Sequence, residues 1–287
     1  DRPGDPEWAK ATARFIKKSD PYGRLVTVHP VISASGSGSK PRDGFEPPWR
    51  IGEFFGTDDA MDVISQQTGQ NGEGVAWNEN LQSLTGDSPT LVASLLADRR
   101  YRKPVLNSEN GYEYLRDYPS YRRQVHHPDK VRRSSWRIAC AGGYFAAGFA
   151  GTLGMGDSWN RKFWGNPTGE DRYTFSLKDE GAAAQLAYLY DFFATLPFWR
   201  MQPFAGVMGD AVALAEVGKT YAIYLPHGGA VSVDLAAVEG ALTARWLNPR
   251  TGTPGEAFRV DAGATRTCHA PDSNDWVLRL EREKSRE

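Results

Sequence analysis

The chain has 287 residues, enough for one large domain or two of ordinary size, and its 40% apolar content can fill hydrophobic cores. Its formal net charge is −1 and it contains no block of like charges, which argues against a nucleic-acid partner or an anionic membrane surface. Nine Trp, 12 Tyr and 13 Phe make it rich in aromatic residues, which form large cores and also pack against sugar rings. We therefore expect a globular protein with a neutral partner.

Targeting, redox and cofactor signals are sparse. There is no apolar run of the roughly 18 residues that a spanning helix needs, and residues 1–6 do not resemble a signal peptide. We expect the natural amino terminus to lie upstream. Cys140 and Cys268 have no metal-ligand spacing, so buried or free thiols are favoured over a disulfide, which stays open. No phosphate loop or dinucleotide fingerprint occurs, and we expect no cofactor.

The first two thirds of the chain alternate between helical and strand patterns. Trp8, Ala11 and Phe15 have helical spacing, and the β-branched run that follows, Leu25 to Val31, is typical of a buried parallel strand. The same alternation then recurs. The expected helices cover residues 6–18, 89–99, 129–139 and 180–195, and the expected strands cover residues 25–31, 61–67, 104–109 and 143–151. Strands separated by helices in this way indicate parallel βα units.

Beyond Pro203 the pattern changes to short strands with Gly, Pro and Asn turns and no helices between them. The expected strands cover residues 211–217, 220–225, 230–235, 242–247 and 276–280. Such a series predicts a β-sandwich. We therefore divide the chain into a βα region, residues 1–203, and a small antiparallel β-sandwich, residues 204–287.

Four βα units make half of an eight-stranded barrel, and four parallel strands alone would leave an exposed edge and an uncovered core. The predicted fold class is α/β, with the carboxyl-terminal half of a (β/α)8 TIM barrel followed by the sandwich. Either the chain is truncated or a partner segment completes the barrel. An open four-stranded α/β domain is the alternative.

In a parallel barrel the carboxyl ends of the strands face the active site, so polar residues there are the first candidates. Glu109 follows the run Lys103-Pro-Val-Leu-Asn-Ser and precedes a Gly, as expected of a glycosidase carboxylate at the barrel rim. Retaining glycosidases need a second carboxyl group about 5–5.5 Å away, and no partner is obvious here. A rim salt bridge is the simpler interpretation of Glu109, and we treat Glu113 as structural.

Six further residues are candidates for sugar contacts: Asn107, His29, Gln67, Tyr144, Trp159 and Asp157. Gln67 is preferred to Gln66 because adjacent strand residues point to opposite faces. A lone His after a strand is as often a hydrogen-bonded structural residue as a ligand contact. His126 and His127 do not indicate a metal site, because adjacent histidines point apart and Asp129 serves as a helix cap.

Four segments in this order resemble the apiosidase-like glycoside hydrolases. They are Asp20-Pro-Tyr-Gly-Arg-Leu-Val-Thr-Val-His-Pro, Met61-Asp-Val-Ile-Ser-Gln-Gln-Thr-Gly, Lys103-Pro-Val-Leu-Asn-Ser-Glu-Asn-Gly-Tyr-Glu and Val131-Arg-Arg-Ser-Ser-Trp-Arg-Ile-Ala-Cys-Ala-Gly-Gly-Tyr. The later segments Tyr224-Leu-Pro-His-Gly-Gly and Ala244-Arg-Trp-Leu-Asn-Pro-Arg-Thr-Gly resemble that family's trailing collagen-binding-type β-domain. The likeness covers most of the chain and rests on the order of the pieces.

The resemblance implies that Glu109 is the nucleophile of a retaining mechanism and that the acid/base carboxylate lies upstream of Asp1. It also implies export to an extracellular or periplasmic site. Ser108, Asn110 and the segment Leu153-Gly-Met-Gly-Asp-Ser-Trp depart from the family pattern, which leaves the sugar open.

Two functions follow as hypotheses. The first is a glycoside hydrolase that acts on a polysaccharide or oligosaccharide side chain, with a second chain as one source of the missing barrel half; furanoside specificity is implied only by the family. The alternative is a non-catalytic carbohydrate- or protein-binding fragment that uses the sandwich, on the evidence of Trp246 beside Asn248-Pro-Arg-Thr-Gly. Trp246 also lies in an apolar run and fits a core position.

Overall fold

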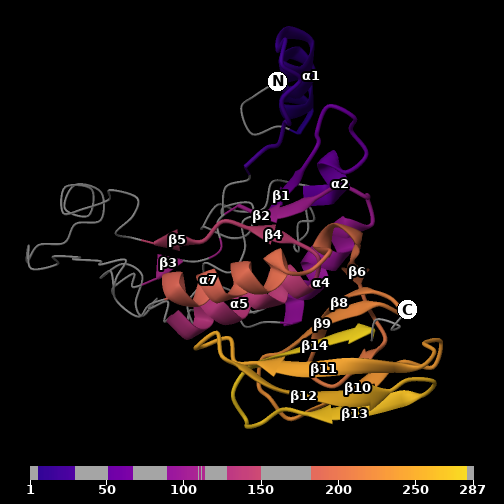
Figure 1. Ribbon diagram of the computed structural model, residues 1–287. Coiled ribbons are helices and arrows are strands. Elements are labelled where there is room, and N and C mark those ends of the chain that lie inside the picture. Colours follow the sequence, from indigo (N-terminus) through magenta and orange to yellow (C-terminus); the bar gives the residue numbers. More distant parts are fainter. Residues whose placement is uncertain are drawn as a thin grey trace, which may run out of the picture. The chain divides into compact units, whose positions relative to one another are not determined.

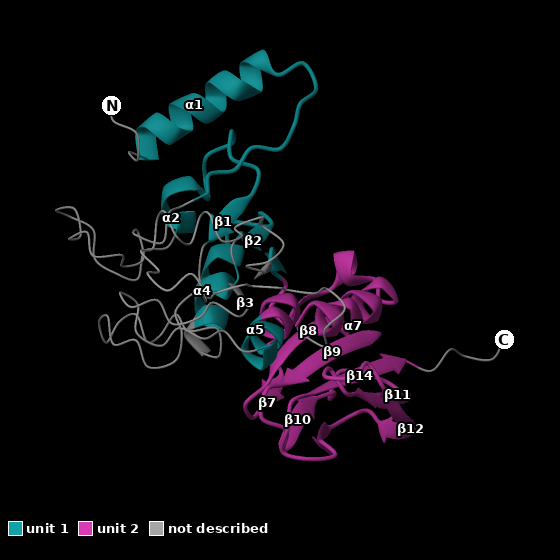
Figure 2. Ribbon diagram, turned by 90° about the vertical axis from the view of Figure 1, so that its left-hand side faces the viewer, with its two compact units in different colours: residues 1–134, 143–176 teal, residues 135–142, 177–287 magenta. Residues whose placement is uncertain are grey.

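The computed structural model describes residues 6–29, 51–66, 89–108, 110, 112–113, 128–149 and 182–282. The chain divides into two compact units (Figure 2): unit 1 comprises residues 1–134 and 143–176, and unit 2 comprises residues 135–142 and 177–287. The domain limit predicted at residue 203 is a sequence-based division and stays a prediction.

The described helices and strands of unit 1 are short (Figure 1). They are α1 (Pro6–Ser19), α2 (Ile51–Phe55), β1 (Ile64–Gln66), α4 (Pro89–Arg99), β2 (Val105–Asn107), β3 (Tyr112–Glu113), β4 (Tyr144–Phe145) and β5 (Gly148–Phe149), with α5 (Pro128–Cys140) beginning in unit 1 and ending in unit 2. Three strands form a parallel sheet in the order β1-β2-β4, and β3 pairs with β5 in parallel. This agrees with the expected parallel βα pattern; the half barrel itself stays a prediction.

The first predicted strand, residues 25–31, does not form a strand over its described part, residues 25–29. Its backbone accepts a strand-like hydrogen bond at one point, where Asp62 N donates to Val26 O at 2.9 Å. The amide of Val26 instead donates to the Asp62 carboxylate at 2.6 Å, so a side chain takes the place of a neighbouring strand's carbonyl. The segment is extended beside the start of β1 but forms no ladder, because a side-chain acceptor cannot continue one.

The strand expected over residues 143–151 is also interrupted, since β4 and β5 are separate two-residue strands with different partners. Sequence reasoning missed α2 as well, a five-residue helix that lies in a segment expected to be a loop.

Unit 2 contains two antiparallel sheets (Figure 1). Its elements after α5 are α7 (Ala182–Ala194), the 3-10 helix η2 (Phe198–Arg200), β6 (Gln202–Pro203), β7 (Val207–Met208), β8 (Val212–Glu216), β9 (Thr220–Leu225), β10 (Ala230–Asp234), β11 (Ala241–Leu247), β12 (Pro254–Asp261), β13 (Thr265–His269) and β14 (Trp276–Arg282). One sheet has the order β12-β11-β14-β9-β8-β6 and the other β13-β10-β7. The expected antiparallel strands are therefore present.

One hydrophobic core joins the two sheets. Ile223 and Leu278 from the larger sheet and Val231 and Val233 from the smaller sheet are completely buried in it. Alternation of buried and exposed residues along β10 places its apolar side chains on this core, as a sandwich requires. Strands β12 and β13 were not predicted, because their exposed positions are rich in charged and small residues, which weakens the strand pattern.

The other face of β9 packs against helical residues of the same unit. Trp136, at the end of α5, stacks on Tyr224 with ring centroids 5.9 Å apart and makes an edge contact with Phe192 of α7 at 5.3 Å. All three side chains are buried. Unit 2 is thus more than the sandwich, because two helical segments share its packing.

Candidate active site

The carboxyl ends of β1 and β2 lie side by side in the parallel sheet, with Gln66 in register with Asn107. Ser108 continues this pairing, because its amide donates to Gln66 O at 2.8 Å and its hydroxyl to the same oxygen at 3.1 Å. On the other side of β2, Asn110 N donates to Ala146 O at 2.9 Å. Both neighbours of position 109 are thus held at the carboxyl edge of the parallel sheet, the edge at which parallel βα folds place their active sites.

Glu109 itself lies outside the described residues, as do Gln67, Asp157 and Trp159. Their predicted roles therefore remain predictions. The described candidates are Asn107, Tyr144 and His29.

Asn107 and Tyr144 occupy different faces of the sheet. Register pairs Leu106 with Tyr144, whereas Asn107 pairs with Phe145 and with Gln66. Residues in register share a face, so Asn107 lies on the face of Gln66 and Tyr144 on the opposite one. Asn107 is completely enclosed and Tyr144 is about half exposed. In this structure Tyr144 has a surface to offer a ligand and Asn107 has none.

His29 is exposed and ends the described extended segment. It is not at the end of a strand, because no strand forms there. The role predicted for His29 in sugar binding stays a prediction.

Sequence reasoning missed a buried polar link beneath the site. Gln66 Nε2 donates to the Asp98 carboxylate of α4 at 2.6 Å, and Gly52 N donates to the same carboxylate at 3.2 Å. Asp98 is fully buried. The available signal was its spacing from Leu91 and Leu95, which places an acid on the apolar face of α4 and calls for a buried partner.

The Gln66 contact also bears on the choice between the two glutamines. Since Gln66 points to α4, its face of β1 is the one that the helix covers. Adjacent strand residues alternate in direction, which is the reason for preferring Gln67 as the ligand contact.

A surface hollow lies at the other end of the sheet. It is lined by α1 and by the turn from Thr57 to Ala60, which leads into the amino end of β1. Two of its basic residues are paired, since Arg14 pairs with Asp58 and Lys17 pairs with Asp62 at 2.6 Å. We assign it no ligand.

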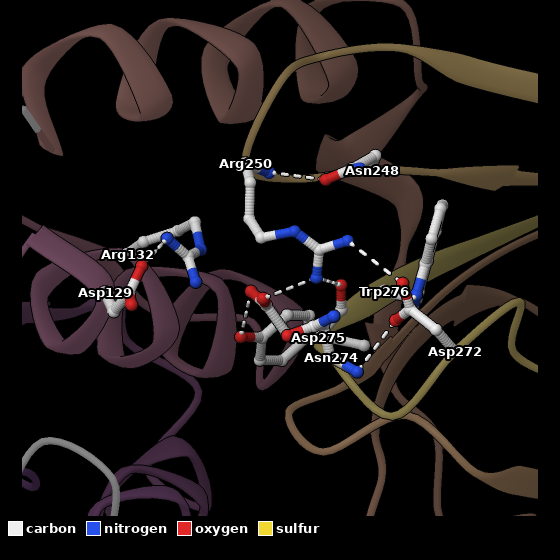
Figure 3. Close-up of polar contacts among 9 residues, drawn as sticks. Asp129, Arg132, Asn248, Arg250, Asp272, Asn274, Asp275 and Trp276 are labelled. Carbon is white, nitrogen blue, oxygen red and sulfur yellow. Dashed lines mark hydrogen bonds and ion pairs between the residues drawn. The ribbon is translucent and has the colours of Figure 1, made fainter. Parts of the chain in front are cut away.

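The loop proposed for binding in the sandwich is engaged in internal contacts (Figure 3). Arg250 Nη1 donates to Asp275 O at 3.0 Å and lies 3.3 Å from its carboxylate, which also accepts the Tyr224 hydroxyl at 3.0 Å. Trp276 Nε1 donates to Asp272 at 2.7 Å, and this bond is the main cause of the lowered pKa of Asp272.

Trp246 belongs to the same interior. It is only 6% exposed and makes an edge contact with Trp276, ring centroids 6.5 Å apart. The core interpretation of Trp246 is therefore the one the structure supports.

Among the described residues, no cluster of three or more His, Cys, Asp or Glu side chains forms a candidate metal site. Within the same ranges, no helix is both long and apolar enough to cross a bilayer. Cys140 and Cys268 are both buried free thiols, and burial raises the pKa of each.

Comparison with known families gives the context for this geometry. The catalytic domain described as apiosidase-like matches residues 1–200. The chain belongs to the apiosidase-like family. Residues 208–281 match a second family, named for a collagen-binding domain of a collagenase, and that name says nothing of what this chain binds. No curated protein matches the chain significantly.

Solved structures agree with the family in fold. A glycoside hydrolase family 5 protein from Bacteroides vulgatus is 21% identical with a TM-score of 0.71, over 94% of this chain and 57% of that one. Another, described as a glycoside hydrolase, is 19% identical with a TM-score of 0.63, over 82% of this chain and 55% of that one. The apiosidase-like chain thus has a glycoside-hydrolase fold and spans little more than half of either neighbour.

Proposed function

We propose that this apiosidase-like chain is the carboxyl-terminal part of a retaining glycoside hydrolase in which Glu109 is the nucleophile. The observation that carries the proposal is the anchoring of Ser108 and Asn110 at the carboxyl end of the parallel sheet, on either side of Glu109. Membership of the family supports a carbohydrate substrate. The family 5 neighbour supports a barrel whose remaining βα units are supplied by a longer chain or by a second one.

The proposed reaction has two steps. The Glu109 carboxylate attacks the anomeric carbon, and the glycosidic C–O bond breaks as an acid upstream of Asp1 gives its proton to the leaving oxygen. In the second step the same upstream group, now a base, takes a proton from a water molecule, and the water oxygen bonds to the anomeric carbon as the bond from that carbon to Glu109 breaks. The sugar leaves with its original anomeric configuration and Glu109 is again a free carboxylate.

Of the six candidates of the sequence analysis, five are proposed to contact the sugar: His29, Gln67, Tyr144, Trp159 and Asp157. Tyr144 has exposed surface for a hydroxyl or stacking contact. Asn107 is enclosed, so its proposed role is to hold the strand end in place rather than to touch the sugar. The proposed substrate is a polysaccharide or an oligosaccharide side chain, and the protein is proposed to act in an extracellular or periplasmic setting.

The test joins native mass with activity. The 287-residue protein is assayed on aryl furanosides and pyranosides beside Glu109→Gln and Glu113→Gln, and any co-purifying chain is identified by mass. We expect Glu109→Gln to abolish hydrolysis and Glu113→Gln to retain it, with nuclear magnetic resonance showing that the first product keeps its anomeric configuration. If wild type and Glu109→Gln are equally inert and the chain is alone, the catalytic proposal for this chain fails.

A further inference from the structure

Helix α1 has two apolar faces, and among the described residues only one of them packs into a hydrophobic cluster. Ala13, with Ala9 beside it, packs into a small cluster that includes Phe55 and Met61. The larger side chains lie elsewhere on the helix, with Trp8 41% and Phe15 69% exposed. The spacing of Trp8, Ala11 and Phe15 is that of one helix face.

We call Trp8, Ala11 and Phe15 the α1 face. Tyr22 and Leu25, which follow the helix in the chain, are each 75% exposed as well. Figure 2 shows α1 at the rim of unit 1, with the α2 side occupied and no other labelled element along its opposite side. Single exposed apolar residues are ordinary, but a row of aromatic side chains at helical spacing indicates an interaction surface.

We propose that the α1 face is a self-association surface on which a second copy of this chain docks, with the two α1 helices antiparallel. In that arrangement a two-fold axis passes near Ala11 and Thr12. Trp8 then meets Phe15 of the partner subunit, and Phe15 meets the partner's Trp8. A two-fold interface must be complementary to itself, and the two aromatic residues, placed either side of a small one, satisfy this condition.

The charges on α1 follow the same symmetry. Glu7 lies in the first turn, and Lys17 and Lys18 lie in the last. Helical geometry places Glu7 and Lys18 on the same flank of the α1 face, because eleven residues are close to three full turns. Antiparallel packing therefore sets Glu7 beside the partner's Lys18, twice, and also opposes the two helix dipoles favourably.

The internal bond of Glu7 is compatible with this contact. Lys10 Nζ donates to one Glu7 oxygen at 2.6 Å, and the Glu7 side chain is still 70% exposed. A carboxylate has two oxygens and accepts several hydrogen bonds, so one Glu7 can serve Lys10 and a second lysine together.

The failure of this inference can be told from failure of the catalytic proposal, because it uses no residue of the strand ends and is measured as self-association rather than hydrolysis. Its test is sedimentation velocity of the 287-residue protein at loading concentrations from about 1 to 200 µM, the range in which a small interface dissociates. We expect a monomer–dimer equilibrium. Phe15→Ser should weaken it at least about tenfold, as expected for an aromatic residue at the centre of an interface.

Trp199→Ser is the matched control, because Trp199 is 67% exposed but lies in unit 2. It should leave the dimer unchanged. Circular dichroism of both variants checks that the fold is retained. A wild-type monomer at the highest concentration overturns the proposal and leaves the α1 face to another occupant, such as preceding barrel units. A dimer weakened equally by both variants also overturns it.

Two further variants test the antiparallel arrangement. Glu7→Lys and Lys18→Glu should each weaken the dimer, and the double exchange should restore it, because the swapped charges again face each other. Ala11→Cys should form a cross-linked dimer with a short bifunctional maleimide, whereas Glu7→Cys should not, since the two copies of residue 7 lie about 13 Å apart along the helices. The reverse cross-linking result rejects the antiparallel geometry.

Discussion

The parallel sheet of unit 1 and the antiparallel sheets of unit 2 are held together in different ways. In unit 2 the ladders are long: β9 pairs six residues with β14, and β11 pairs six with β14 on its other side. In unit 1 β1 pairs three residues with β2, and β2 pairs two with β4. Short ladders leave more backbone groups to be satisfied by other means.

In unit 1, acidic side chains accept hydrogen bonds from some of these backbone groups. The Asp62 carboxylate accepts the amide of Val26, and the Asp98 carboxylate accepts those of Gly52 and the Gln66 side chain. Lys103 Nζ in turn donates to Asp58 O at 2.6 Å. The described part of unit 1 therefore depends on individual polar side chains, whereas the sandwich depends on repeated backbone pairing and a continuous core.

The largest predicted effect concerns Asp275 in unit 2. This buried acid binds two side chains, although most of the sandwich is held together by backbone pairing. Asp275→Ala removes the acceptor shared by Arg250 and Tyr224 and leaves a guanidinium and a buried hydroxyl without it. We expect a loss of about 3–5 kcal/mol of stability, the range for breaking a buried ion pair. Urea denaturation combined with hydrogen exchange of the β9 and β14 amides measures it.

Asp261→Ala is the control for Asp275→Ala. Asp261 pairs with Arg259 on the surface of the same sheet, with both side chains more than half exposed. Exposed pairs contribute little, so this variant should fall within about 0.5 kcal/mol of wild type. Equal losses in the two variants would mean that burial is not what makes the Asp275 contact strong.

Asp98→Ala tests the dependence of unit 1 on its acids. It removes the acceptor of the Gly52 amide and leaves the Gln66 amide only its longer bonds to Ser94, at 3.3 and 3.4 Å; we expect a cost of about 2–3 kcal/mol. Hydrogen exchange should accelerate in α2 and β1 and stay unchanged in β9 and β14. The exposed Asp59→Ala, from the same unit, should change neither.

Gly252→Ala tests how the sandwich turn meets α7. Gly252 has a φ of +71°, and an added Cβ would lie 2.5 Å from the Tyr188 ring. Gly263 has a φ of +81° with open space around it, so Gly263→Ala isolates the backbone strain. We expect stability losses of about 1 kcal/mol for Gly263→Ala and about 2 kcal/mol for Gly252→Ala, measured by thermal unfolding. Equal losses would show that Tyr188 moves aside without cost.

The sequence predicts the strands of unit 2 better than those of unit 1. Strand β9 was predicted with both its ends, because its six residues carry a strong strand pattern between turns. The segment beginning at Leu25 has an equally strong apolar pattern and forms no ladder, because its amide at Val26 is bound by a distant carboxylate. Periodicity reports which residues can be buried, but not which partner takes each backbone group.

The candidate site shows the same limit. Residue order alone located Asn107 and Tyr144 near the strand ends, but the register that separates their faces depends on how β2 aligns with β4. Likewise Trp246 was placed in a strand correctly, and only its contact with Trp276 decides between core and surface. The pairing of distant strands decides which way a side chain points, and this pairing cannot be read from the local sequence pattern.

The smallest predicted effect concerns pH. The hydrogen bond from Lys17 is the largest cause that lowers the pKa of Asp62, with the Val26 amide and the charge of Lys103 acting in the same direction. The folded-state pKa is therefore below the unfolded value of about 3.9. The ionised form stabilises unit 1 fully above that value, and the contribution disappears as pH falls through the folded-state pKa.

Asp62→Asn isolates this contribution, because the amide oxygen can still accept from Val26 while the charge beside Lys17 is lost. The difference in unfolding free energy between wild type and variant should be up to about 1 kcal/mol at pH 7, as expected for a partly exposed pair. It should shrink as pH is lowered from 5 to 2. A difference that stays constant over that range would mean that the geometry of the carboxylate, and not its charge, holds residues 25–29 beside β1.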